Sequence, residues 1–173
     1  MNILYSVCLV PNREDTSYLD YIIASLAQKY GAFPFIPHLT VYGGISAPEK
    51  ILKTAVNQSL LNIQQFSIEV KKLDYSDNFS KTLFIEFGAN NSMQKIYDSL
   101  RLKLKIYKDY ILTPHISLIY KNKLPDEEKR KIIKSFKIKP RLVINRCIII
   151  SANKHITKEE DVKDWKIVYD KIF

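Results

Sequence analysis

The sequence contains one short phrase twice, once in each half of the chain. It is written first as Pro37-His38-Leu39-Thr40-Val41 and later as Pro114-His115-Ile116-Ser117-Leu118. In a β-strand, residues two apart point to the same face. Each phrase therefore predicts a strand with an imidazole beside a hydroxyl on one face and apolar anchors on the other. A repeated strand motif of this kind favours a fold with two related halves.

The hydrophobic pattern repeats in the same order around these two strands. Apolar alternation predicts strands, spacings of three and four predict helices, and Gly and Pro mark their ends. Each half reads strand, helix, strand, helix, strand, and one further strand closes the chain. The predicted strands are residues 3–10, 38–42, 66–70, 82–87, 116–120, 142–150 and 165–173, and the predicted helices start near Ser17, Ser46, Ser92 and Pro125.

Two local signals set boundaries in the first half. Ser46 with Glu49, around Pro48, forms a predicted capping box at the start of the second helix. Gly43-Gly44 is interpreted as a turn that stops the strand after His38. We predict an α+β, bilobal fold in which two pseudo-symmetric lobes with mainly antiparallel sheets enclose a central groove. No linker-like stretch divides the halves, so residues 1–173 are expected to form one bilobal domain.

Composition narrows the class of protein. The chain is 46% hydrophobic and 26% charged, which excludes a disordered chain, and its net charge of +9 favours anionic partners. Cys8 and Cys147 each lie in an apolar run and are expected to be buried free thiols. No cysteine pair has metal-ligand spacing, and the apolar stretch at the N-terminus is too short to span a membrane. We expect a cytoplasmic monomer with no metal or other cofactor and no membrane contact.

The paired motifs suit phosphodiester chemistry. Histidine has an unperturbed pKa of about 6.5, so His38 and His115 can act as base and acid on opposite sides of a phosphorus atom. The hydroxyls of Thr40 and Ser117 can donate hydrogen bonds to the non-bridging phosphate oxygens. This scheme requires no metal. The alternative is a pair of strand-end histidines that make ordinary hydrogen bonds.

A third histidine has the same spacing, in His155-Ile156-Thr157. No apolar strand holds it, and Lys158 and the acidic run 159–161 follow it. We interpret His155 as a solvent-exposed loop residue, with a position over the groove as the alternative.

With these motifs the sequence resembles the 2H phosphoesterase superfamily, whose members carry two His-x-Thr/Ser motifs on a bilobal fold. Runs 30–41 and 115–120 are similar to the two motifs of its cyclic phosphodiesterase branch, and runs 5–11 and 164–168 are similar to the ends of that branch. The resemblance implies that His38, Thr40, His115 and Ser117 are the catalytic set. It also implies a metal-free reaction that opens nucleoside 2′,3′-cyclic phosphates or ADP-ribose 1″,2″-cyclic phosphate to a phosphomonoester. Members of the RNA 2′,3′-cyclic phosphodiesterase and 2′-5′ ligase-like group usually have more arginine around the motifs.

Aromatic residues near the motifs are candidates for substrate binding. Tyr42 shares the His38 face by parity and is a candidate for stacking on a base, whereas Tyr120 faces away from His115 unless a bulge intervenes. Phe35 precedes the first motif and is a candidate for the groove wall. Core packing is the alternative for each of them. In segment 121–141, nine Lys and Arg residues face three acidic ones, which indicates either a solvated helix face or a basic rim for nucleotides.

These observations predict an enzyme that hydrolyses a cyclic phosphate on a nucleotide or an RNA 3′ end. A second enzyme hypothesis uses the same residues on 2′-5′ or longer oligonucleotide phosphodiesters, including ligation. A third hypothesis, from another class, is a basic RNA-binding module whose histidines are structural.

Overall fold

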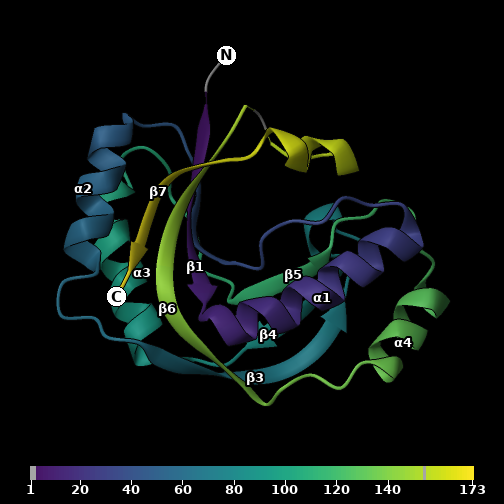
Figure 1. Cartoon of the computed structure of the whole chain (residues 1–173). Coiled ribbons are helices and arrows are strands. Elements are labelled where there is room, and N and C mark those ends of the chain that lie inside the picture. The colour runs from purple at the N-terminus through teal and green to yellow at the C-terminus, as the bar shows by residue number, and fades with distance from the viewer. Residues whose placement is uncertain (1–2, 154) are drawn as a thin grey trace.

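The computed structural model describes residues 3–153 and 155–173 and has the predicted elements in the predicted order (Figure 1). The strands are β1 (Leu4–Pro11), β2 (Leu39–Ile45), β3 (Phe66–Tyr75), β4 (Leu83–Phe87), β5 (His115–Ile119), β6 (Arg141–Ala152) and β7 (Lys166–Ile172). The helices are α1 (Arg13–Tyr30), α2 (Glu49–Ser59), α3 (Asn91–Leu104) and α4 (Asp126–Ser135), and the short 3-10 turns are η1 (Phe79–Lys81) and η2 (Glu159–Asp164).

Two helix starts differ from the prediction. Helix α1 begins before Ser17, because the side chain of Asn12 accepts a hydrogen bond from the Asp15 backbone N–H at 2.9 Å and caps the helix there. Helix α2 begins after Pro48 without a side-chain cap, so the predicted Ser46–Glu49 capping box is wrong. Proline fixes the backbone torsion at this N-terminus and replaces the cap as the start signal.

The strands join into a single antiparallel sheet rather than two separate ones. Its order is β1-β2-β5-β4-β3-β6-β7, and β1 also pairs with β6. Strand β6 makes this possible, because Arg141–Ile144 pairs with β3 and Ile144–Ala152 pairs with β1. Strands β2 and β5 meet at one Cα pair, Leu39 with Ile116. The circuit of strands is therefore closed at a narrow seam where the two sequence motifs lie side by side.

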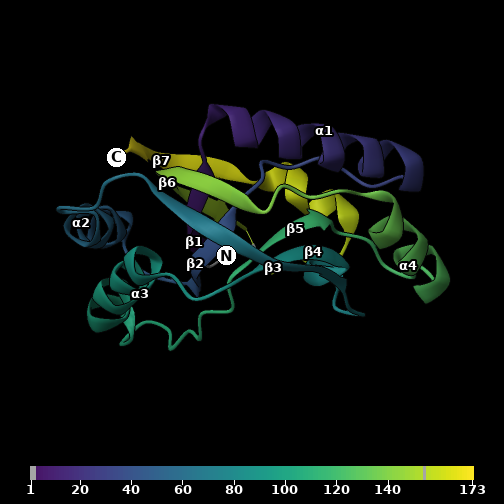
Figure 2. The same ribbon diagram turned by 90° about the horizontal axis from the view of Figure 1, so that it is seen from below.

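The two halves of the sequence exchange elements in space. Strands β1, β2, β6 and β7 lie with α2 and α3 in what we call the His38 lobe, and β3, β4 and β5 lie with α1 and α4 in the His115 lobe. Figures 1 and 2 show α2 and α3 together at one end of the molecule and α4 at the other. Each half lends its first helix and its last strand to the opposite lobe. The architectural repeat is thus real, but neither half closes its own sheet.

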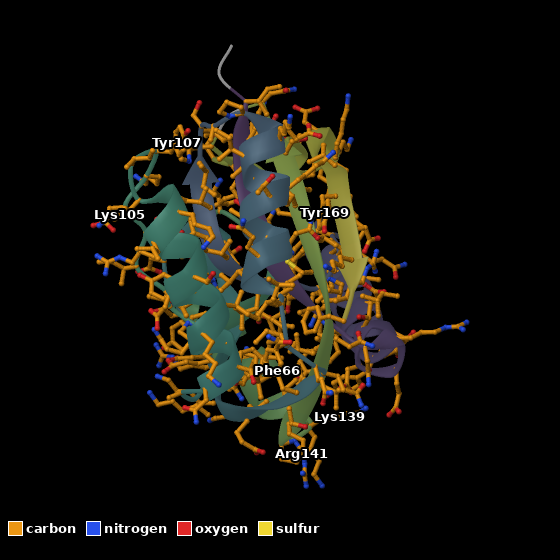
Figure 3. The ribbon with its side chains drawn as sticks, turned by 90° about the vertical axis from the view of Figure 1, so that its left-hand side faces the viewer. Phe66, Lys105, Tyr107, Lys139, Arg141 and Tyr169 are labelled. Atoms are coloured by element: carbon orange, nitrogen blue, oxygen red, sulfur yellow. The ribbon has the colours of Figure 1, made fainter. Side chains whose placement is uncertain are left out.

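Polar contacts hold the exchanged elements in place. The buried carboxylate of Asp15, on α1, accepts hydrogen bonds from the Val143 backbone N–H and from Lys139, both at 2.8 Å. On the opposite side, the Tyr169 hydroxyl donates to Asn57 on α2 at 2.6 Å. Figure 3 shows Tyr169 on the outer strand beside α2 and Lys139 near the start of β6. A buried carboxylate with full partners is costly to disturb, which makes Asp15 a fixed point of the fold.

The main core contains buried apolar residues from strands and helices of both lobes. A small second cluster lies on the other face of β1 and β6. Cys8 belongs to this second cluster and Cys147 to the main one. Both are buried free thiols, as predicted. Burial raises the pKa of Cys8 to about 12 and also raises that of Cys147, so neither is a ready nucleophile at neutral pH.

Candidate active site

The seam between β2 and β5 brings the two motifs together. Since Leu39 pairs with Ile116 in antiparallel register, one step along each strand sets His38 opposite Ser117 and Thr40 opposite His115. The apolar residues of both motifs point into the core and are fully buried. The imidazoles and the Thr40 hydroxyl are thereby turned toward the same side of the sheet.

A β-bulge follows each motif at the same distance from its histidine. On β2, Cys8 pairs with Thr40 and Val7 with Tyr42, so Val41 is the extra residue. On β5, Phe84 pairs with Ser117 and Leu83 with Ile119, which makes Leu118 the extra residue. A bulge shifts the alternation of side chains by one position. The residue five after each histidine therefore returns to the histidine face, and the residue four after it is turned away.

The bulges reverse the expectation for Tyr42 and meet the condition set for Tyr120. Tyr42 is fully buried, its hydroxyl donates to the Lys108 carbonyl, and its ring packs against Tyr97 and Tyr110. The prediction that Tyr42 is free to stack on a base is therefore wrong, because simple parity ignored the bulge. Tyr120 lines the cavity described next. Its true counterpart on β2 is Gly43, not Tyr42.

A cavity of about 230 Å³ lies above the seam. Among the described residues, four of the predicted site residues line it: His38, Thr40, His115 and Tyr120. Its remaining lining residues come from the ends of β1, β2 and β6, from η1, and from the loops before β5 and β7: Leu4, Ser6, Gly44, Ser80, Tyr110, Ile150, Ala152, His155, Ile156 and Trp165. The cavity thus takes residues from both lobes, as expected for a groove at a junction.

The two histidine rings are held in the same way. His38 Nδ1 lies 2.7 Å from the Ile36 carbonyl oxygen, and His115 Nδ1 lies 2.6 Å from the Thr113 carbonyl oxygen. A carbonyl oxygen only accepts, so each ring carries its proton on Nδ1 and, when neutral, a lone pair on Nε2. Both rings therefore have an Nε2 left for proton transfer in the cavity.

The environments of the rings lower both pKa values but to different extents. Burial is the largest cause for His38, and its pKa falls to about 4, with a smaller contribution from the positive charge of His115. Burial also lowers the pKa of His115, and the Lys81 ammonium adds to the effect. Lys81 lies over the Phe84 ring at 4.2 Å, and that ring meets His115 edge-on at 5.8 Å. His38 is thus the ring more strongly held in its neutral, proton-accepting form.

The two hydroxyls of the motifs are not equivalent. Thr40 lines the cavity, and its Oγ1 lies 3.7 Å from Cys8 Sγ. Ser117 is buried, and its hydroxyl donates to the Ser80 carbonyl of η1 at 2.6 Å. A hydroxyl has one proton to donate. In this structure Thr40 is available to a ligand in the cavity, whereas Ser117 fixes the turn that forms part of the wall.

An aromatic cluster packs against His38 on one side. Phe35 stacks on Tyr120 with ring centroids 4.2 Å apart and planes 7° apart, and Trp165 meets the His38 ring edge-on at 5.5 Å. Phe35 also meets His38 edge-on at 6.2 Å. Phe35 therefore backs the cavity-lining ring of Tyr120 rather than lining the cavity itself. Edge-to-face and offset contacts of this kind fix ring orientation as well as burying area.

Several lining residues have little or no signal in the sequence. His155 is exposed, as predicted, and it also lines the cavity, which was the alternative interpretation. Trp165, the single tryptophan, was placed at the start of the last strand, and it precedes β7 at the cavity wall. Tyr110 lies in the loop after α3, where no periodicity marks it. Only the rarity of tryptophan beside the closing strand was a usable signal.

Two lysines of segment 121–141 are engaged in contacts within the protein. Lys129 is buried and donates to the Ser76 carbonyl, Asp77 and Asp126. Lys131 is exposed and pairs with Glu127 at 2.9 Å. These contacts favour the interpretation of α4 as a paired, solvated helix over that of a phosphate-binding rim.

The sequence matches the family model of the 2′-5′ RNA ligase superfamily over residues 23–154, a span that includes both motifs and β6. The chain belongs to that superfamily. The resemblance to 2H phosphoesterases is thereby confirmed at this level. A comparison with curated protein sequences finds no match.

Solved structures share the fold. E. coli LigT complexed with 3′-AMP is 9% identical, with 98% of this chain and 96% of that chain covered and a TM-score of 0.57. The protein TT0787 of Thermus thermophilus is 12% identical, with 96% of each chain covered and a TM-score of 0.60. A structure described as a phosphoesterase is 11% identical, with 98% of this chain and 97% of that chain covered and a TM-score of 0.55. At these identities the likeness concerns the fold alone.

Two features are absent from the described residues. None of the helices in residues 3–153 and 155–173 combines the length and the apolar character needed to cross a bilayer. Nor do three or more His, Cys, Asp or Glu side chains gather there in a way that could hold a metal ion.

Proposed function

We propose that the protein hydrolyses a nucleotide cyclic phosphate, such as a nucleoside 2′,3′-cyclic phosphate or ADP-ribose 1″,2″-cyclic phosphate, to a phosphomonoester. The observation that carries the proposal is the matched pair His38 and His115 at one cavity, each with Nδ1 on a carbonyl oxygen and, among the described residues, no hydrogen bond at Nε2. Membership in a superfamily of phosphoesterases and ligases supports the reaction class.

In the proposed reaction His38 is the base and His115 the acid. The oxygen of a water molecule attacks phosphorus and passes its proton to His38 Nε2. The bond from phosphorus to one ribose oxygen breaks, and that oxygen takes the proton from His115 Nε2. The assignment follows from burial, which holds the pKa of His38 at about 4 and keeps this ring neutral. Each proton transfer typically contributes about 10²–10⁴-fold in rate.

The acid role requires a proton on His115, whose pKa is lowered in the free protein. The bound phosphate would raise this pKa, because a negative charge beside the ring stabilises the imidazolium form. Thr40 would donate its hydroxyl proton to a non-bridging oxygen as charge develops there. Ser117 would act through the η1 turn, by fixing Ser80 at the cavity wall.

The test is turnover of adenosine 2′,3′-cyclic phosphate in the presence of EDTA, followed by phosphorus NMR. We expect one phosphomonoester product and no requirement for a divalent ion. Loss of activity in EDTA that a divalent ion restores would contradict the metal-independent scheme. Nucleotide binding without turnover would favour the alternative of a binding module.

The family match also favours a second candidate, a 2′-5′ phosphodiester in RNA as the substrate of the same residues. The net charge of +9 suits a longer anionic substrate. Comparing kcat/KM on the cyclic mononucleotide with that on a 2′-5′-linked dinucleotide decides between them. A large preference for the dinucleotide would indicate that the substrate is a 2′-5′ phosphodiester in RNA.

A further inference from the structure

The two motif strands differ at the position where each returns to the histidine face. Directly after β5 this position holds Tyr120, and on β2 it holds Gly43. A Cβ at Gly43 would lie 2.9 Å from Thr40 Cγ2, 3.3 Å from Ser6 Oγ and 3.5 Å from Tyr110 Cε2. The space beside Gly43 is therefore already occupied, in part by a ring that arrives from the loop before β5. The Tyr110 ring thus packs beside Gly43, at the place where the other motif carries its own tyrosine.

The next residue on β2 is also a glycine. Gly44 has φ +70°, a left-handed conformation that favours glycine, and it lines the cavity. A Cβ at Gly44 would lie 3.7 Å from His155 Cε1. Thus Tyr110 and His155 flank two consecutive glycines, one ring beside each. The Gly43-Gly44 pair, interpreted from sequence as a turn, is instead a stretch of strand backbone without side chains.

Tyr110 is held in place by its surroundings, and His155 is carried by a neighbouring segment. The Tyr110 hydroxyl donates to the Thr40 carbonyl at 3.4 Å, and its own carbonyl accepts from the Tyr97 hydroxyl at 2.6 Å. His155 begins the segment 155–165, which we call the strap. Figure 1 shows the strap, in yellow, reaching from the end of β6 toward the β5 side before the chain returns as β7.

The strap is tied to the opposite lobe. The Asn122 side chain donates to the Thr157 carbonyl, and the Asn122 backbone N–H donates to Glu159, both at 3.1 Å. Lys121 pairs with Glu159 at 3.3 Å. These contacts begin two residues after His155, so the ring is carried by an anchored segment and not by a free loop. A segment anchored in advance brings its ring to a ligand at a lower cost in conformational entropy.

The lining of the cavity that includes Gly44 suits a flat, mostly apolar ligand with polar edges. Leu4, Ile150, Ala152 and Ile156 line the cavity along with the Tyr110 ring. The Gly44 backbone and the exposed imidazole of His155 supply hydrogen-bonding groups. Charged side chains do not line the cavity among the described residues, if the histidines are neutral. A phosphate is poorly matched to such a region, whereas a nucleobase is well matched.

We propose that the part of the cavity formed by the Gly44 backbone, Tyr110 and His155 is the subsite for the nucleobase of the substrate. The inference rests on the proposed function for the placing of the phosphate between His38 and His115. It makes His155 a specificity-determining residue, which contacts the base and takes no part in proton transfer.

The test compares two substrates that share a cyclic phosphate, adenosine 2′,3′-cyclic phosphate and glycerol 1,2-cyclic phosphate, which has no base. Base stacking on a side chain is worth about 1–3 kcal/mol, or roughly 5- to 150-fold in affinity. His155→Ala should raise KM for the adenosine substrate by about 10-fold and leave its kcat unchanged. Both constants for the glycerol substrate should stay at the wild-type values. His155→Phe, which keeps a flat ring, should retain most of the affinity for adenosine.

Asn153→Ala is the matched control, because Asn153 is exposed, neutral and close to His155 in sequence. It should leave both substrates unaffected. An equal rise of KM on both substrates would overturn the inference and assign His155 to the phosphate. An unchanged KM for adenosine would overturn it as well, and so would a fall in kcat on both substrates.

A binding measurement separates this inference from the proposed function. Trp165 is the single tryptophan and lines the cavity, so its fluorescence reports on ligands there. His155→Ala should weaken binding of adenosine 3′-monophosphate about 10-fold and leave inorganic phosphate unaffected. If the wild type binds the nucleotide in this way but turns over neither cyclic phosphate, the hydrolase proposal fails and the base subsite stands. If wild type and variant bind the nucleotide equally, the subsite fails whatever the activity.

Discussion

The strands β2 and β5 carry the same phrase, the same bulge and the same Nδ1 contact, yet they present different chemistry. On β2 the histidine is 7% exposed and the threonine hydroxyl faces the cavity. On β5 the histidine is half-buried beside Lys81, and the serine hydroxyl is committed to the Ser80 carbonyl. The repeat supplies two similar rings at one seam. The neighbours of each ring do not repeat, because His38 is the more deeply buried ring and only His115 has Lys81 nearby. In the proposed reaction His38 is the base and His115 the acid.

The largest effects should come from removing either ring. His38→Ala and His115→Ala should each lower kcat on a cyclic nucleotide by at least about 10²-fold. The double variant should be far less impaired than the product of the two losses, because both rings serve one transition state. Steady-state kinetics check the losses, and circular dichroism checks that the variants fold. Near-wild-type turnover by either single variant would contradict the proposal that the two histidines act together.

The hydroxyls should show the asymmetry of the strands. Thr40→Val keeps the branched shape and removes a donor at the cavity, so kcat should fall by about 10²-fold, as for the loss of one oxyanion donor. Ser117→Ala removes a hydrogen bond to the η1 turn instead, and its kcat should fall less than that of Thr40→Val. Both variants are compared by kcat and KM on the same cyclic nucleotide. Equal losses would show that Ser117 leaves Ser80 to contact the phosphate.

Protonation of His38 should destabilise the fold in acid. Its pKa is about 4 in the folded chain, against about 6.5 for an unperturbed histidine. Between these values the unfolded chain binds more protons, so the free energy of unfolding falls as pH drops from about 6.5 to about 4. The contribution of this one ring is about 3 kcal/mol at most. Urea unfolding across this pH range should show a shallower decline for His38→Gln than for the wild type, and equal slopes would contradict it.

The smallest expected effect is a shift of the pH profile when the positive charge of Lys81, near His115, is removed. In the proposed roles, kcat/KM plotted against pH is bell-shaped. As the pH increases, the acid limb rises because His38 loses its proton, and the alkaline limb falls because His115 loses its proton. Lys81→Gln removes a positive charge that lowers the pKa of His115. The alkaline limb should therefore move to higher pH by less than about one pH unit, while the acid limb stays in place. Movement of the acid limb instead would exchange the roles of the two rings.

The order of elements and the paired motifs were predictable because they depend on local periodicity. Helix α3 shows its buried face in Met93, Ile96 and Leu100, and each histidine phrase alternates as a strand must. The bulges at Val41 and Leu118 were not predictable, because a bulge is defined by the partner strand and not by the bulged one. This is why Tyr42 was misplaced, and why Tyr120 was placed only conditionally.

Long-range contacts explain the other differences. The exchange of α1 and α3 between lobes depends on packing across the whole molecule, and either connectivity satisfies the same hydrophobic pattern. Tyr110 and His155 lie in loops, where no period marks a residue as part of a site. Asn122, which ties the strap, is separated from Thr157 by most of the C-terminal third of the chain. Sequence alone gives such a pair no distinguishing signal.

The assignment of base and acid to the two strands is tested most directly by a substrate that needs no acid. Bis(p-nitrophenyl) phosphate has a weakly basic leaving group that departs without a proton, so only the base is still required. Wild type, His38→Ala and His115→Ala are compared by release of p-nitrophenolate at one pH. The account predicts that His115→Ala approaches the wild-type rate on this substrate while His38→Ala remains at least about 10²-fold slower. Recovery of His38→Ala with continued failure of His115→Ala would contradict it.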